Sequence, residues 1–240
     1  LRTNDIWSPY PEEFNRQAIS KICMWHFAPT ETSKNNLLLE GVNEKNIFVT
    51  GNTVIDSLFY VIDEIENSEN IKNELHQNLD SCLSFNWQKD KFILITGHRR
   101  ENFGVGFLEI CNAIKELSFH YKNIHFIYPV HLNPNVQDPV HSILKNIPNI
   151  HLIKPLQYQS FIYLLKHSYI VLTDSGGIQE EAPSFGKPVV VMRDTTERPE
   201  AVEAGTVILS GADKKQIVSC ISYLIDDQTR YSSMSKSHNP

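Results

Sequence analysis

Residues 169–184 read YIVLTDSGGIQEEAPS, an apolar run followed by a polar turn with two glycines and then a helix-forming segment. The run over residues 169–173 is short and continuously apolar, which is typical of a strand buried on both faces of a parallel sheet. A buried strand that leads through a glycine turn into a helix is one half of a βαβ unit. This segment therefore predicts an α/β fold.

The same alternation of strand and helix extends over residues 91–227. Apolar runs predict strands over 92–96, 124–128, 151–154, 169–173, 188–192 and 206–209. Helical spacing predicts helices over 107–120, 136–145, 160–166, 178–184 and 214–225. The alternation predicts a parallel sheet with right-handed crossovers, whose ligands bind beyond the carboxyl ends of the strands.

The first part of the chain is less regular. Strands over 26–29 and 46–50 are expected to flank a helix over 32–40, and 53–66 has the pattern of a long amphipathic helix. The polar stretch 67–91 predicts a surface helix and a linker. We place a domain boundary near Gly51, which divides the chain into residues 1–50 and residues 51–240.

The composition excludes several classes of protein. Of the 240 residues 41% are hydrophobic and 21% are charged, as in ordinary globular domains and unlike disordered chains. The net charge is −6 and no basic block is present, which argues against nucleic acid or an anionic membrane as the main partner. The four cysteines lie far apart, so neither a zinc ribbon nor a disulfide framework is expected and a reducing, cytoplasmic location fits.

The most informative candidate site is the turn TDSGG at residues 173–177. Backbone N–H groups at the start of a helix bind anions, and glycines let a phosphate approach them. Ser175 adds a hydroxyl donor to Gly176 and Gly177, and Glu181, about one helical turn further on, is placed to accept hydrogen bonds from a ribose diol. The alternative interpretation is a plain helix cap with glycines in a tight turn.

Three further motifs follow predicted strands. His98 and Arg99 lie in TGHRREN (96–102), His131 lies in YPVHLNP (128–134), and Arg198 lies in RDTTERPE (193–200). Histidine serves as an acid, a base or a phosphate donor, and arginine holds phosphate. The alternatives are a solvated basic loop, a rigid proline turn and a surface run of charges.

One candidate lies near the start of the chain. In SPYPEE (8–13) two prolines stiffen the backbone before a pair of carboxylates, and Glu12 is a candidate catalytic carboxylate. The alternative is a pair of acidic residues at the beginning of a helix.

Taken together, these motifs resemble the non-hydrolysing UDP-N-acetylglucosamine 2-epimerases of bacteria. The matching phrases are LRTNDIWSPYPEEFNR (1–16), HFAPTETSKNNLL (26–38), VTGNTVID (49–56), TGHRRENFGVGF (96–107), YPVHLNPNV (128–136), LTDSGGIQEEAPSFGKPVVVMRDTTERPEAVEAGT (172–206) and MSKSHNP (234–240). The resemblance implies two Rossmann-like domains of the GT-B type. Residues 1–50 are then the tail of the first domain, and the remainder is the nucleotide-binding domain. It also implies that about a hundred residues precede this segment and a final helix follows it.

The resemblance implies an activity as well. The family interconverts UDP-N-acetylglucosamine and UDP-N-acetylmannosamine for surface polysaccharide synthesis, by eliminating UDP and adding it back. No nicotinamide cofactor and no metal are implied, and a homodimer is expected. Two alternatives stay open: a GT-B glycosyltransferase, and a truncated, non-catalytic module that binds nucleotide sugars.

Residue by residue, the resemblance assigns His98 and Glu12 to active-site positions: His98 stabilises the leaving diphosphate, and Glu12 serves proton transfer or positioning. The UDP positions that it implies are Leu156 and Phe161 at the uracil, Ser175, Gly176 and Gly177 at the phosphates, Glu181 at the ribose diol and Arg198 in the nucleotide site. Arg99 and His131 match positions that bind a second, activating UDP-N-acetylglucosamine. Because the family's other active-site acids lie upstream of Leu1, residues 1–240 alone are expected to be weak or inactive catalysts. Without a complete first domain, Ile22, Met24, Trp25 and Phe27 are expected to be exposed.

Overall fold

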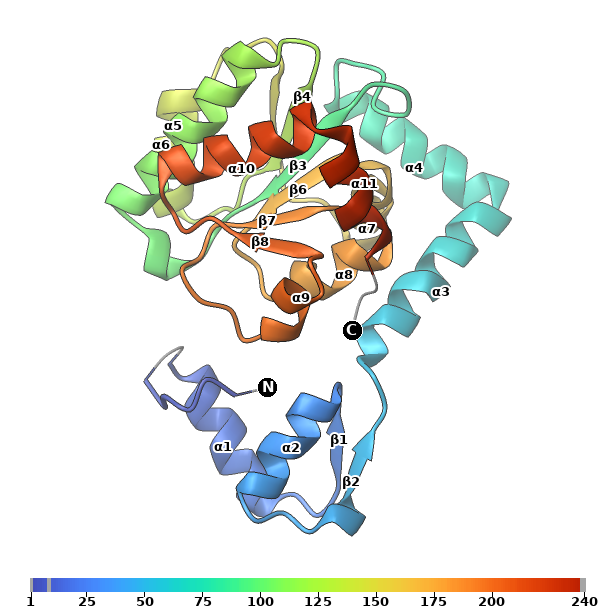
Figure 1. Ribbon diagram of the computed structural model, residues 1–240. Helices are drawn as coiled ribbons and strands as arrows, with labels where there is room; N and C mark the ends of the chain where they lie inside the picture. Colours follow the sequence, from blue (N-terminus) through green and yellow to red (C-terminus); the bar gives the residue numbers. More distant parts are fainter. Residues whose placement is uncertain (1, 8–9, 238–240) are drawn as a thin grey trace. The chain divides into compact units, whose positions relative to one another are not determined.

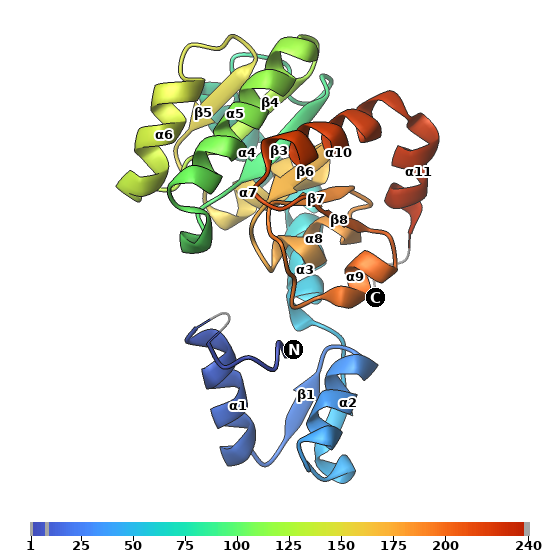
Figure 2. The same ribbon diagram turned by 60° about the vertical axis from the view of Figure 1, so that its left-hand side comes forward.

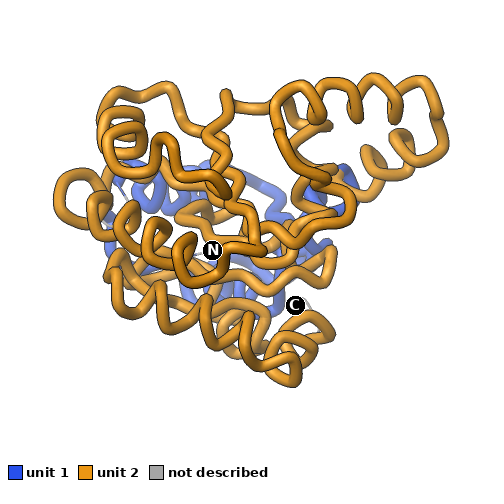
Figure 3. The backbone as a smooth tube through the Cα atoms, turned by 90° about the horizontal axis from the view of Figure 1, so that it is seen from above, with its two compact units in different colours: residues 1–57, 240 blue, residues 58–239 orange. Residues whose placement is uncertain are grey.

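The structure, a computed structural model, describes residues 2–7 and 10–237. Ser8 and Pro9 of the first family motif and the last three residues, 238–240, lie outside the described residues. The chain divides into two compact units, residues 1–57 and 58–239, as Figure 3 shows. The boundary expected near Gly51 precedes helix α3 (Thr53–Asn67) and stays a prediction.

The first unit contains a small parallel α/β arrangement. Its described elements are α1 (Glu12–Ile22), β1 (His26–Ala28), α2 (Glu31–Leu39), the 3-10 turn η1 (Glu44–Asn46) and β2 (Ile47–Val49). The two strands pair in parallel, and Ala28, Leu37 and Ile47 form a small buried cluster. The expected strands and helix of this region are confirmed to within a few residues. Ile22, Met24, Trp25 and Phe27 are exposed, as expected, each by more than half.

The second unit is built on a six-stranded sheet in which all described strands run parallel, in the order β5-β4-β3-β6-β7-β8. The strands are β3 (Phe92–Thr96), β4 (His125–Pro129), β5 (Ile150–Ile153), β6 (Ile170–Thr173), β7 (Val189–Val191) and β8 (Val207–Leu209). The helices around it are α3, α4 (Glu69–Cys82), η2 (Arg100–Asn102), α5 (Val105–His120), α6 (Pro134–Leu144), α7 (Tyr158–His167), α8 (Ile178–Ser184), α9 (Pro199–Glu203), α10 (Lys214–Asp226) and α11 (Gln228–Lys236). This confirms the predicted α/β class and the parallel sheet.

Two apolar cores cover the two faces of this sheet. In β3, Ile93 and Ile95 join the core under α5, α6, α10 and α11, whereas Phe92 and Leu94 join the core under α3, α4, α7, α8 and α9. Figures 1 and 2 show α5, α6 and α10 side by side over one face. Because successive side chains of a strand point to opposite faces and both faces are covered, the run FILI (92–95) is apolar at every position.

Two parts of the second unit differ from the prediction. The stretch 67–91 is more than a surface helix and linker, because Leu75 and Leu79 of α4 and the following Leu83 and Trp87 are buried. Helix α11 was not predicted; it begins after Asp227, whose side chain accepts the backbone N–H of Arg230. Such a cap stabilises a helix start whose sequence is otherwise polar.

Candidate functional site

The candidate site lies at the carboxyl ends of β3 and β6. The chain runs outward from β3 through β4 to β5 and then returns to β6 on the other side of β3, so the strand order reverses between these two neighbours. Ligands of open parallel sheets bind in the crevice at such a point. Thr96 and Thr173, the last residues of the two strands, are paired in register, and their hydroxyl oxygens lie 2.5 Å apart.

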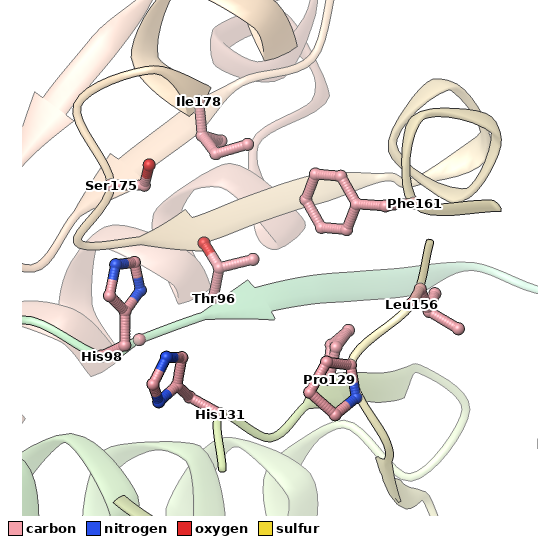
Figure 4. Close-up of a pocket in the computed structure, with 10 residues that line it drawn as sticks. Thr96, His98, Pro129, His131, Leu156, Phe161, Ser175 and Ile178 are labelled. Atoms are coloured by element: carbon pink, nitrogen blue, oxygen red, sulfur yellow. The ribbon is translucent and has the colours of Figure 1, made fainter. Parts of the chain in front are cut away.

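A pocket of about 240 Å³ opens at this edge (Figure 4). It brings together five of the residues that the sequence singled out: His98, His131, Leu156, Phe161 and Ser175. The other lining residues are Thr96, Gly97, Pro129, Pro155 and Ile178. The pocket is therefore largely apolar, with two imidazole rings and a serine.

The two histidines lie next to each other at one end of the pocket (Figure 4). Their rings are stacked, with centroids 5.4 Å apart and an angle of 18° between the planes. Nδ1 of His131 accepts the backbone N–H of Asn133 at 3.1 Å, so this nitrogen carries no proton and the His131 ring is neutral in this arrangement. The side chain of His98 is 46% exposed, which leaves it accessible to a ligand.

A residue that sequence reasoning missed, Asp174, holds the loop that carries His98. Asp174 is fully buried, and its Oδ2 accepts the backbone N–H groups of His98 and Arg99, each at 2.8 Å. The side chain of Asn102 adds a longer contact to the same oxygen at 3.5 Å. The signal that was available is position: an acid directly after a buried strand lies at the sheet edge, where loop N–H groups need acceptors.

The glycine turn after β6 is closely packed. A Cβ atom on Gly176 would lie 2.8 Å from Nη1 of Arg198, so no larger residue fits while the guanidinium stays in place. A Cβ atom on Gly177 would lie 3.5 Å from Oε1 of Glu181. Arg198 and Glu181, both predicted site residues, thus lie against the glycine pair.

The charges around this turn are paired. Arg198 forms an ion pair with Glu180, and its Nη1 lies 3.7 Å from Glu197. Burial and the neighbouring carboxylate of Glu180 raise the pKa of Glu181, against the opposing charge of Arg198. Glu181 is therefore a strong hydrogen-bond acceptor held in a partly desolvated position.

A second, deeper ion pair links two of the loops. Arg193 donates to Glu101 at 2.7 Å and to Glu197 at 3.0 Å, and the side chains of Arg193 and Glu197 are 4% and 5% exposed. Although burial opposes ionisation of Glu197, the hydrogen bonds and charge of Arg193 hold the pKa of its carboxyl below the usual value. The bond from Arg193 to Glu101 of η2 ties the loop after β7 to the loop after β3.

Six predicted site residues are not among those that line the pocket: Gly176, Gly177, Glu181 and Arg198 around the glycine turn, and Glu12 and Arg99. Glu12 belongs to the first unit, where it is exposed at the start of α1; the adjacent Glu13 is the buried one and binds Arg16 and Gln17. The side chain of Arg99 is not among those that line the pocket, although its backbone is tied to Asp174. Within the described residues, no group of three His, Cys, Asp or Glu side chains is placed to hold a metal ion.

Comparison with known proteins identifies the family. The family model described as UDP-N-acetylglucosamine 2-epimerase matches residues 1–240. The chain belongs to the UDP-N-acetylglucosamine 2-epimerase family. It is 55% identical to the UDP-N-acetylglucosamine 2-epimerase of Yersinia pestis and 56% identical to that of Campylobacter jejuni, with the whole chain aligned to 63% and 62% of those proteins.

Solved structures of the epimerase family share the fold. The enzyme of Neisseria meningitidis, crystallised bound to UDP-GlcNAc, superimposes with a TM-score of 0.93 at 48% identity. The match covers 100% of this chain and 63% of that enzyme. The enzyme of Methanocaldococcus jannaschii, in complex with UDP-GlcNAc and UDP, superimposes with a TM-score of 0.83 at 34% identity. The match covers 100% of this chain and 62% of that enzyme. These matches confirm the GT-B type of fold that the resemblance implied.

The chain spans about 63% of the length of the curated epimerases that it matches. None of its described helices is long and apolar enough to cross a membrane.

Proposed function

We propose that the protein containing this chain interconverts UDP-N-acetylglucosamine and UDP-N-acetylmannosamine at C2 of the sugar, as a step in supplying surface polysaccharide precursors. The observation that carries the proposal is the pocket in which His98, Leu156, Phe161 and Ser175 lie together at the point where the strand order reverses. The relatives crystallised with UDP-GlcNAc support a nucleotide sugar as its ligand.

The arrangement suits the parts of UDP in order along the sheet edge. Leu156 and Phe161 offer an apolar wall to the uracil ring, and Ser175 with the tightly packed glycine pair offers donors to the phosphates. We assign Glu181 to the ribose diol, because its carboxylate lies beside Gly177. Arg198, beside Gly176, contributes positive charge to the nucleotide site.

The reaction that these residues serve is an elimination followed by an addition. A base takes the C2 proton, the bond from C1 to the diphosphate oxygen breaks, and its electron pair leaves with UDP to give a 2-acetamido glycal. Protonation of C2 on the opposite face and return of UDP to C1 complete the epimerisation. We assign His98 to stabilising the negative charge of the leaving diphosphate, and Glu12 to proton transfer or positioning.

We assign Arg99 and His131 to a second, activating molecule of UDP-N-acetylglucosamine. The stacking of His131 on His98 supports this assignment, since a ligand touching His131 lies next to the first site. We further propose a homodimer in the cytoplasm. All four cysteines are free thiols, which fits a reducing compartment.

The test uses the full-length protein in deuterium oxide with UDP-N-acetylglucosamine, followed by proton NMR. Elimination and re-addition predict a UDP-N-acetylmannosamine anomeric signal and loss of the C2 proton signal from both sugars, because the proton at C2 comes from solvent. His98→Ala is the matched control and is expected to abolish most turnover. Transfer of the sugar to an acceptor without epimerisation would identify a glycosyltransferase, and UDP binding without any product would identify a binding module. Either result would overturn the proposal.

A further inference from the structure

Asp174 is a fully buried acid at the candidate site to which the proposed chemistry gives no role. It lies directly after β6, is fully buried, and its two carboxylate oxygens have different surroundings. Oδ2 accepts two backbone N–H groups at 2.8 Å, which fixes the orientation of the carboxylate. Oδ1 is buried and makes no hydrogen bond to any described residue.

The His98 ring lies close to this unused oxygen. Nδ1 of His98 lies 3.7 Å from Oδ1, an ion-pair distance that is longer than a hydrogen bond. A buried carboxylate oxygen without a donor is costly, and hydrogen bonds in unliganded sites often tighten when a ligand binds. The His98 ring also stacks on His131, whose Nδ1 accepts a backbone N–H and so carries no proton, and the carboxylate of Asp174 provides a negative charge beside His98.

We propose that Asp174 is the positioning residue for His98: its Oδ2 sets the loop, and its Oδ1 accepts a hydrogen bond from Nδ1–H of His98, which directs Nε2 of the ring to the ligand. This inference rests on the proposed function for the role of His98, but the geometry of the pair does not depend on it. Asp174 itself touches neither sugar nor diphosphate and forms no covalent bond.

The chemical consequence concerns the leaving group. When the bond from C1 to the diphosphate oxygen breaks, its electron pair stays on the diphosphate, and a proton on Nε2 stabilises it best if the ring is an imidazolium. An imidazolium carries a second proton on Nδ1, which needs an acceptor. The carboxylate of Asp174 accepts a hydrogen bond from that N–H, stays ionised and compensates the charge of the ring, as in other histidine–carboxylate pairs.

The decisive variant is Asp174→Asn. Its amide oxygen can keep the two backbone bonds made by Oδ2, so the loop is retained. Its NH2 group takes the place of Oδ1, which removes the acceptor for Nδ1 and the negative charge. The matched control is Asn102→Ala, which removes the third contact to Oδ2 and a 3.2 Å bond to the carbonyl of Met192 while leaving the Asp174 charge in place.

Two measurements separate a positioning role from a structural one. The first is the tautomer of His98 in residues 1–240, read from the 15N shifts of the ring nitrogens and assigned with His98→Gln. We expect the proton on Nδ1 in the wild type and in Asn102→Ala, and a shift to the Nε2–H form in Asp174→Asn.

The second measurement is turnover of the full-length protein, where Asp174→Asn is expected to lower kcat about 10²-fold or more with KM changed little. In the His98→Gln background, the same change is expected to have almost no further effect.

The opposite results would overturn the inference. If Asp174→Asn and Asn102→Ala lowered kcat equally and left the tautomer unchanged, Asp174 would only support the loop. If Asp174→Asn failed to fold, an Nε2–H tautomer in the wild type would refute the pairing and an Nδ1–H tautomer would support it. A wild-type protein that does not epimerise would contradict the proposed function, while the tautomer measurement would still decide whether Asp174 orients His98.

Discussion

Replacing Arg193 by Met is expected to destabilise the second unit by about 3 kcal/mol at pH 7. Arg193 is bound to Glu197 within the protein, where both side chains are almost fully buried. Removing one partner of a buried ion pair typically costs about 3–5 kcal/mol, because the remaining charge is left uncompensated. We expect the lower end of that range, since Arg198 lies 3.7 Å from the same carboxylate and offsets part of the loss.

The pH dependence of this loss has a definite sign. The pKa of Glu197 is lowered in the folded protein, so its ionisation stabilises the fold above the pKa of the unfolded chain, and that contribution is lost as the pH falls through the folded value. The difference between wild type and Arg193→Met is therefore largest near neutral pH. It shrinks as the pH falls from about 4.5, the ordinary pKa of a glutamate, through the lower pKa of Glu197 in the folded wild type.

Urea unfolding measures the effect. Trp87 is buried in the second unit with its indole N–H bound to Asp80, so its fluorescence reports on this unit. With a denaturant slope of about 2 kcal/mol per M, the midpoint falls by about 1–2 M. Glu101→Ala is the matched control: this partner of Arg193 is 45% exposed, and its loss is expected to cost less than about 1 kcal/mol. Equal midpoints for Arg193→Met and Glu101→Ala would refute the reasoning, as would a double variant Arg193→Met/Glu197→Leu that recovered nothing.

Three further predictions follow from the site and from the opposite edge of the sheet. Glu181→Ala is expected to weaken UDP binding to residues 1–240 by about 1.5–3 kcal/mol in calorimetry, and an unchanged affinity would reject the ribose assignment. In the full-length protein, His98→Ala is expected to lower kcat far more than it weakens UDP binding; a change confined to KM would make His98 a binding residue only. His151, bound to His125 at 3.0 Å, has its pKa lowered to about 4 by burial and by His125, so the unfolded chain takes up the proton first as the pH falls. Stability is thus expected to drop by about 2 kcal/mol between pH 7 and pH 5, and urea midpoints should show that His151→Gln removes most of this drop.

The sequence predicted the second unit well where burial was continuous. Runs such as FILI (92–95) have no polar position, so they identify central strands directly. The same reasoning predicted a helix in the stretch of α4 but missed its burial, because only Leu75 and Leu79 mark the buried face among polar neighbours. It also failed for α11, which Met234 and the stacking of Tyr231 on Tyr169 hold against the core. Contacts with residues far along the chain decide both helices, and a local pattern does not contain them.

The candidate site was predicted in part for a similar reason. His98, His131 and Ser175 each follow a predicted strand, and the common edge of a parallel sheet brings such residues together. Asp174 was overlooked because its burial depends on backbone donors 75 and 76 residues away. Which of Glu12 and Glu13 is buried depends on which side of α1 faces the rest of the first unit. Glu13 is on that side, and the sequence of two adjacent acids does not reveal it.

The pocket has a consequence for how this unit would respond to a ligand. Its walls come from segments after β3, β4, β5 and β6 and from α7 and α8, so no single hairpin or helix pair contains it. The binding surface exists only once four strands are aligned, and partly unfolded forms lack it. A ligand at 100 times its dissociation constant would then raise the free energy of global unfolding by about 2.7 kcal/mol. Thermal-shift screening of this chain would accordingly detect ligands of this pocket before any catalytic assay exists.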